Sequence, residues 1–117
     1  MRNFIQPGDT ITAPAPYDRT AGQPALIGNL VGVALSDVLS GASGEFKTTG
    51  VYDLPKAPSQ AWATFGAVVY FDNTNKRFTT TASGNTLAGS VMATTGNGPG
   101  ETTGRVRLNG VARPAEA

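Results

Sequence analysis

The sequence predicts an all-β fold, a small antiparallel β-barrel or sandwich of about seven short strands with at most one short helix. Runs of β-branched and aromatic residues recur at a spacing of about 8–12 residues. The 15 glycines and 8 prolines separate these runs, and no stretch shows the apolar spacing of an amphipathic helix of three turns. The 117 residues fit one domain, since domains usually contain ~100–200 residues.

Residues 1–24 are predicted to form an extended N-terminal arm, and residues 25–117 a single β-domain. Prolines interrupt the arm, and proline lacks the backbone donor that an interior strand requires. Only residues 9–13 alternate in polarity, which indicates a short edge strand. Phe4 and Ile5 are large apolar residues on this terminus, so they either contact a partner or another subunit, or dock on the parent domain.

The next elements are two strands and a connector. Residues 25–35 are rich in Leu, Val and Ile and predict one strand that bends at its glycines. Residues 45–54 predict a second strand with a bulge at Gly50, because a lone glycine in a strand pattern often marks a bulge. A helix of about one or two turns is expected to begin near Ser59, since Pro58 prevents an earlier start.

The C-terminal half predicts four further strands. Residues 67–72 and 76–81 form a hairpin, because residues 73–75 are rich in Asn, which favours turns. Residues 86–93 form the next strand. Residues 104–108 alternate strictly, which predicts that Val106 and Leu108 face the core and the two intervening arginines face solvent.

The composition excludes several classes of chemistry. The chain has no cysteine and no histidine, so it cannot form disulfides, thiolate or imidazole metal sites, cysteine nucleophiles or histidine-based triads. No catalytic residue, cofactor or metal is expected. The interpretation is therefore that the protein is not an enzyme.

The charge distribution argues against nucleic acid and membrane partners. Nine Lys and Arg residues balance eight Asp and Glu residues, and the basic residues are scattered rather than clustered as in nucleic-acid-binding proteins. The longest uncharged apolar stretch, residues 25–35, falls short of the ~20 residues of a membrane-spanning helix. The N-terminus carries no apolar segment typical of a secretory signal.

Three patterns could carry chemistry, and each has a simpler structural explanation. Acid pairs for glycoside hydrolysis would have to come from Asp37, Glu45, Asp53 and Asp72, but Asp53 and Asp72 are expected to cap turns at strand ends. Residues 72–75 start like an oxygen-ligand calcium loop but lack its later glycine and glutamate, so a hairpin turn is favoured. Residues 96–104 are rich in glycine but lack the lysine of a phosphate-binding loop, so a flexible loop is favoured.

Five aromatic residues cluster in the middle of the sequence: Trp62, Phe65, Tyr70, Phe71 and Phe78. A platform for stacking bases would also need a positive groove, and only two basic residues lie nearby. Packing in the core or at a subunit interface is therefore favoured, and Trp62 is a candidate for the latter.

Six blocks along the chain carry a family resemblance: residues 3–11, 22–34, 50–56, 66–72, 84–89 and 106–110. Their sequence and order resemble the small tailed-phage capsid cement family, long catalogued as a domain of unknown function and sometimes labelled a predicted recombinase. The chain has Phe71-Asp72 where the family pattern has Trp-Asp, so an aromatic residue is retained. No Walker motif supports the recombinase label.

The resemblance implies a virion protein that binds the outer surface of an assembled bacteriophage capsid and stabilises it. The implied partners are the major capsid protein and two further copies in a homotrimer, and the protein would be made in the bacterial cytoplasm. Capsid or subunit contacts are predicted for Phe4, Ile5, Asp9, Ile11 and Trp62. The arm is expected to order on the capsid or on a neighbouring subunit, with residues 9–13 adding a strand there. A carbohydrate- or surface-binding β-module is the alternative.

Overall fold

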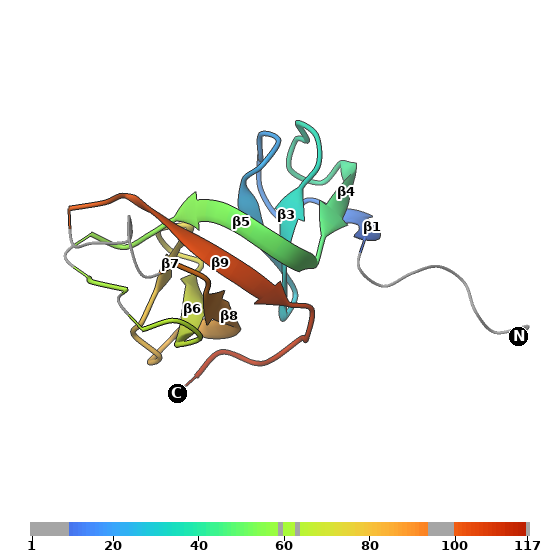
Figure 1. The fold of residues 1–117 in the computed structure, drawn as a ribbon. Coiled ribbons are helices and arrows are strands. Elements are labelled where there is room, and N and C mark those ends of the chain that lie inside the picture. The colour runs from blue at the N-terminus through green and yellow to red at the C-terminus, as the bar shows by residue number, and fades with distance from the viewer. Residues whose placement is uncertain (1–9, 59, 63, 94–99, 117) are drawn as a thin grey trace, which may run out of the picture.

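The protein is all-β in the computed structural model, which describes residues 10–58, 60–62, 64–93 and 100–116. These residues contain nine strands and no helix, where the sequence predicted about seven strands and a short helix near Ser59. The strands are β1 (Thr10–Pro14), β2 (Pro24–Ile27), β3 (Leu30–Ala34), β4 (Ser43–Lys47), β5 (Thr49–Pro55), β6 (Val68–Asp72), β7 (Arg77–Thr79), β8 (Thr86–Val91) and β9 (Thr103–Asn109). They form a four-stranded sheet, β1-β4-β3-β2, and a five-stranded sheet, β5-β9-β8-β6-β7 (Figure 1). Every pairing between these strands is antiparallel, which confirms the predicted fold class.

The single bent strand predicted over residues 25–35 is instead a hairpin of β2 and β3. Ile27 pairs with Leu30, and Gly28 between them has a φ of 63°. A positive φ at the first central position of a two-residue turn is the reason glycine is favoured there. The apolar character of both strands concealed this turn in the sequence.

The chain passes between the two sheets at Thr48, so the strand predicted over residues 45–54 is also two strands. No bulge forms at Gly50, which pairs with Leu108 inside β5 and has a φ of 112°. A Cβ at this position would lie 2.9 Å from the hydroxyl oxygen of Tyr52. Glycine therefore makes room for the Tyr52 ring, and the observed register shift lies between Val69 and Tyr70.

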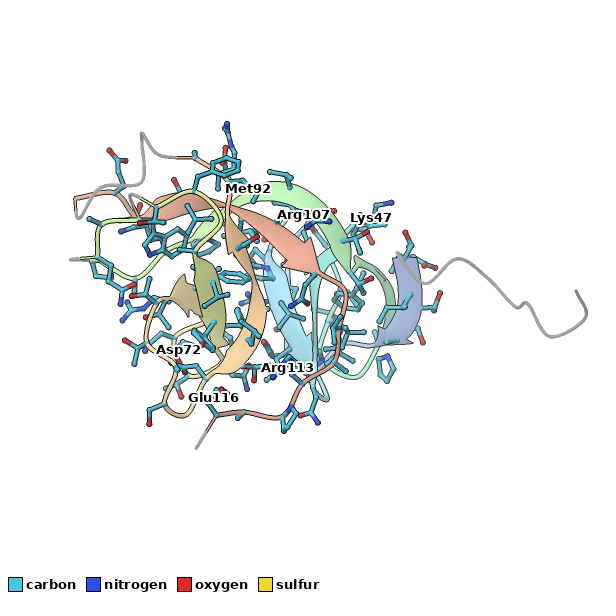
Figure 2. The ribbon with its side chains drawn as sticks, turned by 60° about the horizontal axis from the view of Figure 1, so that its bottom comes forward. Lys47, Asp72, Met92, Arg107, Arg113 and Glu116 are labelled. Atoms are coloured by element: carbon cyan, nitrogen blue, oxygen red, sulfur yellow. The ribbon has the colours of Figure 1, made fainter. Side chains whose placement is uncertain are left out.

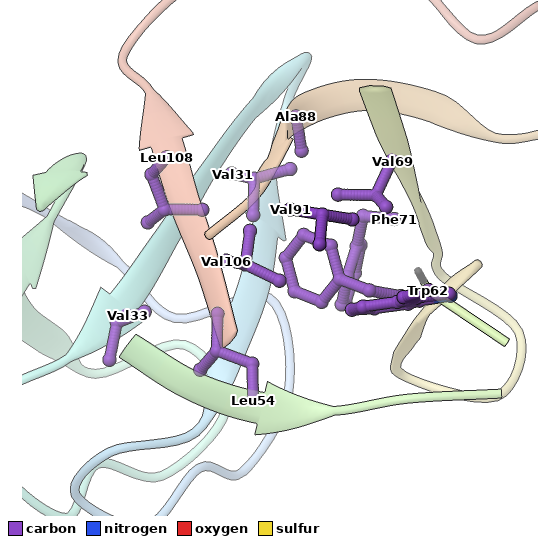
Figure 3. Packing of buried hydrophobic residues seen from close by; sticks show 11 residues of the cluster. Val31, Val33, Leu54, Trp62, Val69, Phe71, Ala88, Val91, Val106 and Leu108 are labelled. Carbon is purple, nitrogen blue, oxygen red and sulfur yellow. The ribbon is translucent and has the colours of Figure 1, made fainter. Parts of the chain in front are cut away.

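The larger of two apolar cores is enclosed by the five-stranded sheet and one face of β3 (Figure 3). Its buried members are Val31, Val33, Leu54, Trp62, Val69, Phe71, Phe78, Ala88, Val91, Val106 and Leu108. Phe71 and Phe78 meet edge to face with ring centroids 5.3 Å apart, a favoured geometry for aromatic pairs. The burial pattern of β9 alternates along the strand, which confirms the predicted orientation of Val106 and Leu108.

The smaller core lies against the opposite face of β3 and contains mostly small residues. Its buried members are Ala15, Ala25, Ala34, Val38 and Phe46, with Ile11, Ala13, Tyr17 and Ile27 packed around them. Gly32 lies on this face, where a Cβ would come within 3.0 Å of the Phe46 Cβ. The β3 sequence thus places valines towards the large core and leaves space for Phe46 on the other side.

Two connections hold the ends of the five-stranded sheet and the C-terminal segment in place. The Ala57 N–H donates to the Phe78 carbonyl at 2.8 Å, which joins the chain after β5 to β7. The C-terminal segment runs past both sheets, because the Arg113 N–H donates to Asn29 and the Glu116 N–H donates to Asn85. Figure 2 shows Arg113 and Glu116 on the same side of the molecule as Asp72.

The predicted hairpin of residues 67–72 and 76–81 is confirmed as β6 and β7, in which Phe71 pairs with Phe78. Within the described ranges, no helix is long and apolar enough to cross a membrane.

Candidate functional site

The strand β1 lies at one edge of the four-stranded sheet, and neighbouring hydrogen bonds reveal which of its backbone groups point outwards. In an antiparallel ladder, residues with inward and outward backbone groups alternate. The Leu35 N–H donates to the Glu45 carbonyl at 3.0 Å, so Glu45 directs its backbone groups to β3. The next residue, Phe46, must direct its groups to β1, where it pairs with Ile11.

A second hydrogen bond leads independently to the same phase, that is, the same assignment of inward and outward residues in β1. The Ala15 N–H donates to the Ala42 carbonyl at 2.9 Å, one step beyond the pairing of Pro14 with Ser43. Residues 11 and 13 therefore point their backbone groups towards β4, and Thr10, Thr12 and Pro14 point theirs away from the sheet. Proline at an outward position agrees with this phase, because its missing N–H interrupts no ladder bond.

The outward groups of β1 form an open edge. Alternation directs the N–H groups of Thr10 and Thr12 away from β4, and within the described ranges no backbone hydrogen bond outside the strand ladders involves them. The side chains of both residues turn towards β4 instead: the Thr12 hydroxyl lies 3.0 Å from each carboxylate oxygen of Glu45, and the Lys47 Nζ lies 3.4 Å from the Thr10 hydroxyl. The backbone edge is consequently not covered by its own side chains.

The opposite edge of the same sheet, at β2, is covered by Tyr17. The Leu26 N–H donates to the Tyr17 hydroxyl at 3.0 Å, and that hydroxyl donates to Asn73 Oδ1 at 2.8 Å. The Arg19 guanidinium donates to the Pro24 carbonyl at 3.0 Å. Burial raises the pKa of Tyr17, although the Leu26 hydrogen bond and the Arg19 charge oppose the rise.

The charged groups of Arg19 and Lys76 both lie close to the Tyr17 ring that covers this edge. The Arg19 guanidinium carbon lies 4.9 Å from the centroid of the Tyr17 ring, and the Lys76 ammonium lies 4.4 Å from it. Cations at these distances are attracted by the electron-rich ring face. Tyr17 is thus held by contacts from both sheets.

The outer edge of β5 is limited at its two ends. The Lys56 N–H donates to the Thr102 carbonyl, so alternation places Thr49 and Pro55 among the outward residues. The Thr49 carbonyl accepts a hydrogen bond from the Tyr52 hydroxyl at 2.7 Å, and Pro55 has no N–H to offer. The same alternation directs the backbone groups of Val51 and Asp53 outwards, so β5, like β1, presents outward groups, whereas the edge at β2 is covered by Tyr17 and Arg19.

The predicted contact residues fall into three places. Phe4, Ile5 and Asp9 lie outside the described residues. Ile11 lies in β1, where its half-buried side chain packs against the small core. Trp62 is buried in the large core and only 2% exposed, so a contact through its side chain would require neighbouring residues to move. The contact roles of these residues, and the boundary between arm and domain at residue 24, stay predictions.

Sequence reasoning missed the surroundings of Trp62. The Lys56 ammonium lies 5.6 Å from the ring centroid and donates to the Ala57 carbonyl at 3.1 Å. Burial lowers the pKa of Lys56, and the Glu101 charge opposes the decrease. A Cβ at Gly104 would collide with the Trp62 ring. A glycine followed by alternating core residues was the available sequence signal for this close approach.

The acidic residues considered for catalysis lie on separate elements. Asp53 lies within β5 rather than at a strand end, and its carboxylate accepts two hydrogen bonds from Arg105 at 3.0 and 3.2 Å. Asp72 ends β6 and accepts hydrogen bonds from Thr74 and Asn75, as the turn interpretation predicted.

The pKa directions of these two residues do not suit a general acid. The hydrogen bond from Arg105 lowers the pKa of Asp53. Burial acts to raise the pKa of Asp72, but the hydrogen bonds from Asn75 and Thr74 outweigh it and the pKa is lowered. A general acid for glycoside hydrolysis needs the opposite shift. Within the described ranges, no group of three acidic residues could hold a metal ion.

A cavity of about 300 Å³ lies beside the loop between β3 and β4. It is lined by Asp18, Arg19, Thr20, Gln23, Asp37, Val38 and Leu39. Its two carboxylates hold loop backbone in place: Asp18 accepts from the Ser40 N–H at 2.7 Å, and Asp37 from the Ala21 N–H at 3.0 Å. The cavity is therefore explained by loop structure rather than by paired catalytic acids.

The outer face of the five-stranded sheet exposes a row of side chains from four strands. Val51 pairs with Arg107, Arg107 with Ser90, and Ser90 with Val68. The two valines are 51% and 53% exposed, which is high for large apolar residues in strands. Figure 2 shows Arg107 on the same side of the molecule as Lys47 and Met92.

Comparison with known proteins gives one match. A family model described as phage cement protein matches residues 5–108. No curated protein and no solved structure matches. The matched range includes β1 to β8 and all of β9 except its last residue, Asn109.

Proposed function

Because this chain belongs to the phage cement protein family, a structural family of phage capsids, we propose that it binds the outer surface of an assembled capsid and stabilises it without catalysing a reaction. The family match over residues 5–108 is the observation that carries this proposal. The open edge of β1 supports it, since an unpaired strand edge is a ready template for another chain.

The mechanism requires only that the protein bind intact shells better than their dissociated subunits. Any molecule with that preference stabilises the assembled state by mass action. We propose that the protein acts as a homotrimer in contact with the major capsid protein. Three linked copies would strengthen attachment by roughly 10²–10⁴ over a single copy through effective concentration.

The exposed row of Val51, Arg107, Ser90 and Val68 supports an interface on the outer face of the five-stranded sheet. Two valines exposed on one face of the sheet would add apolar area to such an interface. Light scattering in solution gives the mass of the free protein, and a monomeric mass at all concentrations would contradict the trimer.

Co-sedimentation with undecorated phage heads tests the proposed function directly. We expect the wild-type protein to pellet with the heads, to saturate at a fixed ratio to the capsid protein, and to raise the temperature at which the heads break open. A protein that leaves both sedimentation and head stability unchanged would refute a cement function.

Removal of residues 1–8 tests the predicted contact role of Phe4 and Ile5. The truncated protein should keep the melting temperature of the wild type, because β1 begins at Thr10, and should no longer bind heads. The double variant Phe4→Ser, Ile5→Ser is the matched control for chain length. Unchanged occupancy of the heads by both variants would exclude a role for these residues.

A further inference from the structure

We propose that the open edge of β1 pairs with an extended backbone segment of the capsid protein, so that the four-stranded sheet gains a fifth strand from its partner. This inference rests on the proposed function and adds the mode of attachment. Strand addition of this type uses main-chain hydrogen bonds for affinity, and it needs outward donors and acceptors in one plane.

The backbone of β1 presents such a set. Its outward groups are the N–H and carbonyl of Thr10, the N–H and carbonyl of Thr12, and the carbonyl of Pro14. The inward partners of Ile11 and Ala13 in β4 keep the strand extended. An incoming strand would therefore meet an edge that is already in β geometry.

The surroundings of the edge leave it accessible. Thr12 and Pro14 are exposed and Thr10 is half-buried. The hydroxyl contacts of Thr12 with Glu45 and of Thr10 with Lys47 draw both side chains back over β4. The described side chains of Thr10 and Thr12 therefore do not lie across the outward backbone groups.

The comparison with β2 shows that this fold covers the other edge of the same sheet. There the Leu26 N–H and the Pro24 carbonyl are satisfied by Tyr17 and Arg19 of the same chain. Proteins generally block sheet edges to avoid unwanted pairing. An edge covered at β2 and left open at β1 indicates that pairing at β1 is used.

The position of β1 in the chain favours the capsid protein as the partner. The residues directly before Thr10 include Phe4, Ile5 and Asp9, which are the predicted contacts to the shell. These predicted contacts precede the first outward group of β1 by one to six residues in the sequence, so both belong to the same short part of the chain.

Self-pairing of β1 fits less well. Two copies paired symmetrically about Thr12 would place Thr10 of each opposite Pro14 of the other, and Pro14 has no N–H to donate. Such a contact uses the same patch on both copies and gives two-fold dimers, whereas the proposed assembly is a trimer.

Proline substitution at Thr12 tests the inference with little change to the isolated fold. Thr12→Pro removes an outward N–H and no backbone bond to β4, but it also removes the hydroxyl that contacts Glu45. Thr12→Val is the matched control, because it removes the same hydroxyl and keeps the N–H. We expect Thr12→Pro to weaken head binding at least about tenfold and Thr12→Val to bind like the wild type.

The same samples are measured by co-sedimentation, thermal melting and light scattering. If Thr12→Pro does not fold, Thr10→Pro replaces it, because the first residue of a strand tolerates proline. If the wild type and the folded proline variant bind heads equally well, the edge contact is wrong. The proposed function would still stand. A proline variant that changes only the oligomeric mass would show a second copy at this edge and also overturn it. Absence of binding by the wild type would overturn both proposals.

Discussion

The two sheets of this protein differ in what fills the space beside them and in how their edges end. The five-stranded sheet encloses a core with Phe71, Phe78 and Trp62, and its last strand is joined to the chain after β5. The four-stranded sheet has a second core made mostly of alanines around Phe46, and β1 leaves one edge open. Most of the stabilising apolar burial therefore belongs to one sheet, and the outward backbone groups of β1 belong to the other.

The largest expected effects come from truncating the central ring of each core. Phe71→Ala should lower the free energy of unfolding by about 3–5 kcal/mol, the usual range for a buried phenylalanine, and should weaken amide protection in both sheets. Phe46→Ala should cause its largest loss of protection in β1, β2 and β4, because the small residues around it belong to these strands and their loops. Hydrogen exchange measured strand by strand distinguishes the two patterns. If both variants lose amide protection equally in all strands, the proposed difference between the two cores is wrong.

Proline at Ala13 provides a test of the alternation in β1. Ala13 faces β4, so Ala13→Pro removes a ladder hydrogen bond and leaves an unpaired carbonyl on Gly44, which should cost about 1–3 kcal/mol. Thr12→Pro should be the milder substitution, because its lost N–H points away from the sheet. Urea unfolding of both variants gives the ranking. A greater loss for Thr12→Pro would show that the assigned phase is reversed.

The contact between the two regions is tested at Tyr17. Tyr17→Phe keeps the ring near Arg19 and Lys76 and removes the hydroxyl that joins Leu26 to Asn73. We expect a loss of about 1 kcal/mol and faster amide exchange at Leu26. Asn73→Ala serves as the control, since it removes the second bond and leaves the Leu26 amide paired.

The pKa of Tyr17 adds a pH test of the same contact. Its pKa is raised in the folded protein, so the associated stability is present below the ordinary tyrosine pKa of about 10 and is lost as pH rises above it. The wild type should consequently lose more stability than Tyr17→Phe between pH 9 and pH 11. Parallel pH curves would contradict the burial of this hydroxyl.

The smallest effect is expected at Asp72, in the turn between β6 and β7. Its lowered pKa means that its stabilising contribution is present above the ordinary aspartate pKa of about 3.9 and is lost as pH falls below it. Asp72→Asn should cost less than about 1 kcal/mol at neutral pH, because the group lies at the surface, and should make the acid-side loss of stability shallower. Chemical unfolding at pH 7 and pH 3 measures both quantities.

Local patterns in the sequence predicted the elements that depend on neighbouring residues. The alternation of β9 and the Asn-rich turn between β6 and β7 were sufficient for those strands, because burial on one face and turn chemistry are local properties. The Gly28-Asn29 turn was missed because it lies inside a run of residues that is otherwise mostly apolar. The crossing at Thr48 was missed because a buried threonine has the same strand preference as its neighbours.

The candidate site could be predicted only in part. The edge strand was placed at residues 9–13, close to the observed β1, because proline and alternation mark it. Which of its backbone groups point outwards depends on the register with β4, more than thirty residues later in the chain. The covering of β2 by Tyr17 depends on contacts with Leu26 and Asn73, and no local pattern encodes such a contact.

The covering of one edge by Tyr17 limits how far the four-stranded sheet can grow. A sheet open on both sides could pass from molecule to molecule and form a fibre of unlimited length. The outward Leu26 N–H and Pro24 carbonyl of β2 are hydrogen-bonded within the same chain. A sheet extended at β1 therefore cannot also be extended at β2, and each molecule ends the sheet that it joins. If the protein binds a capsid in several copies, as proposed, it would gain attachment without starting the growth of a fibre.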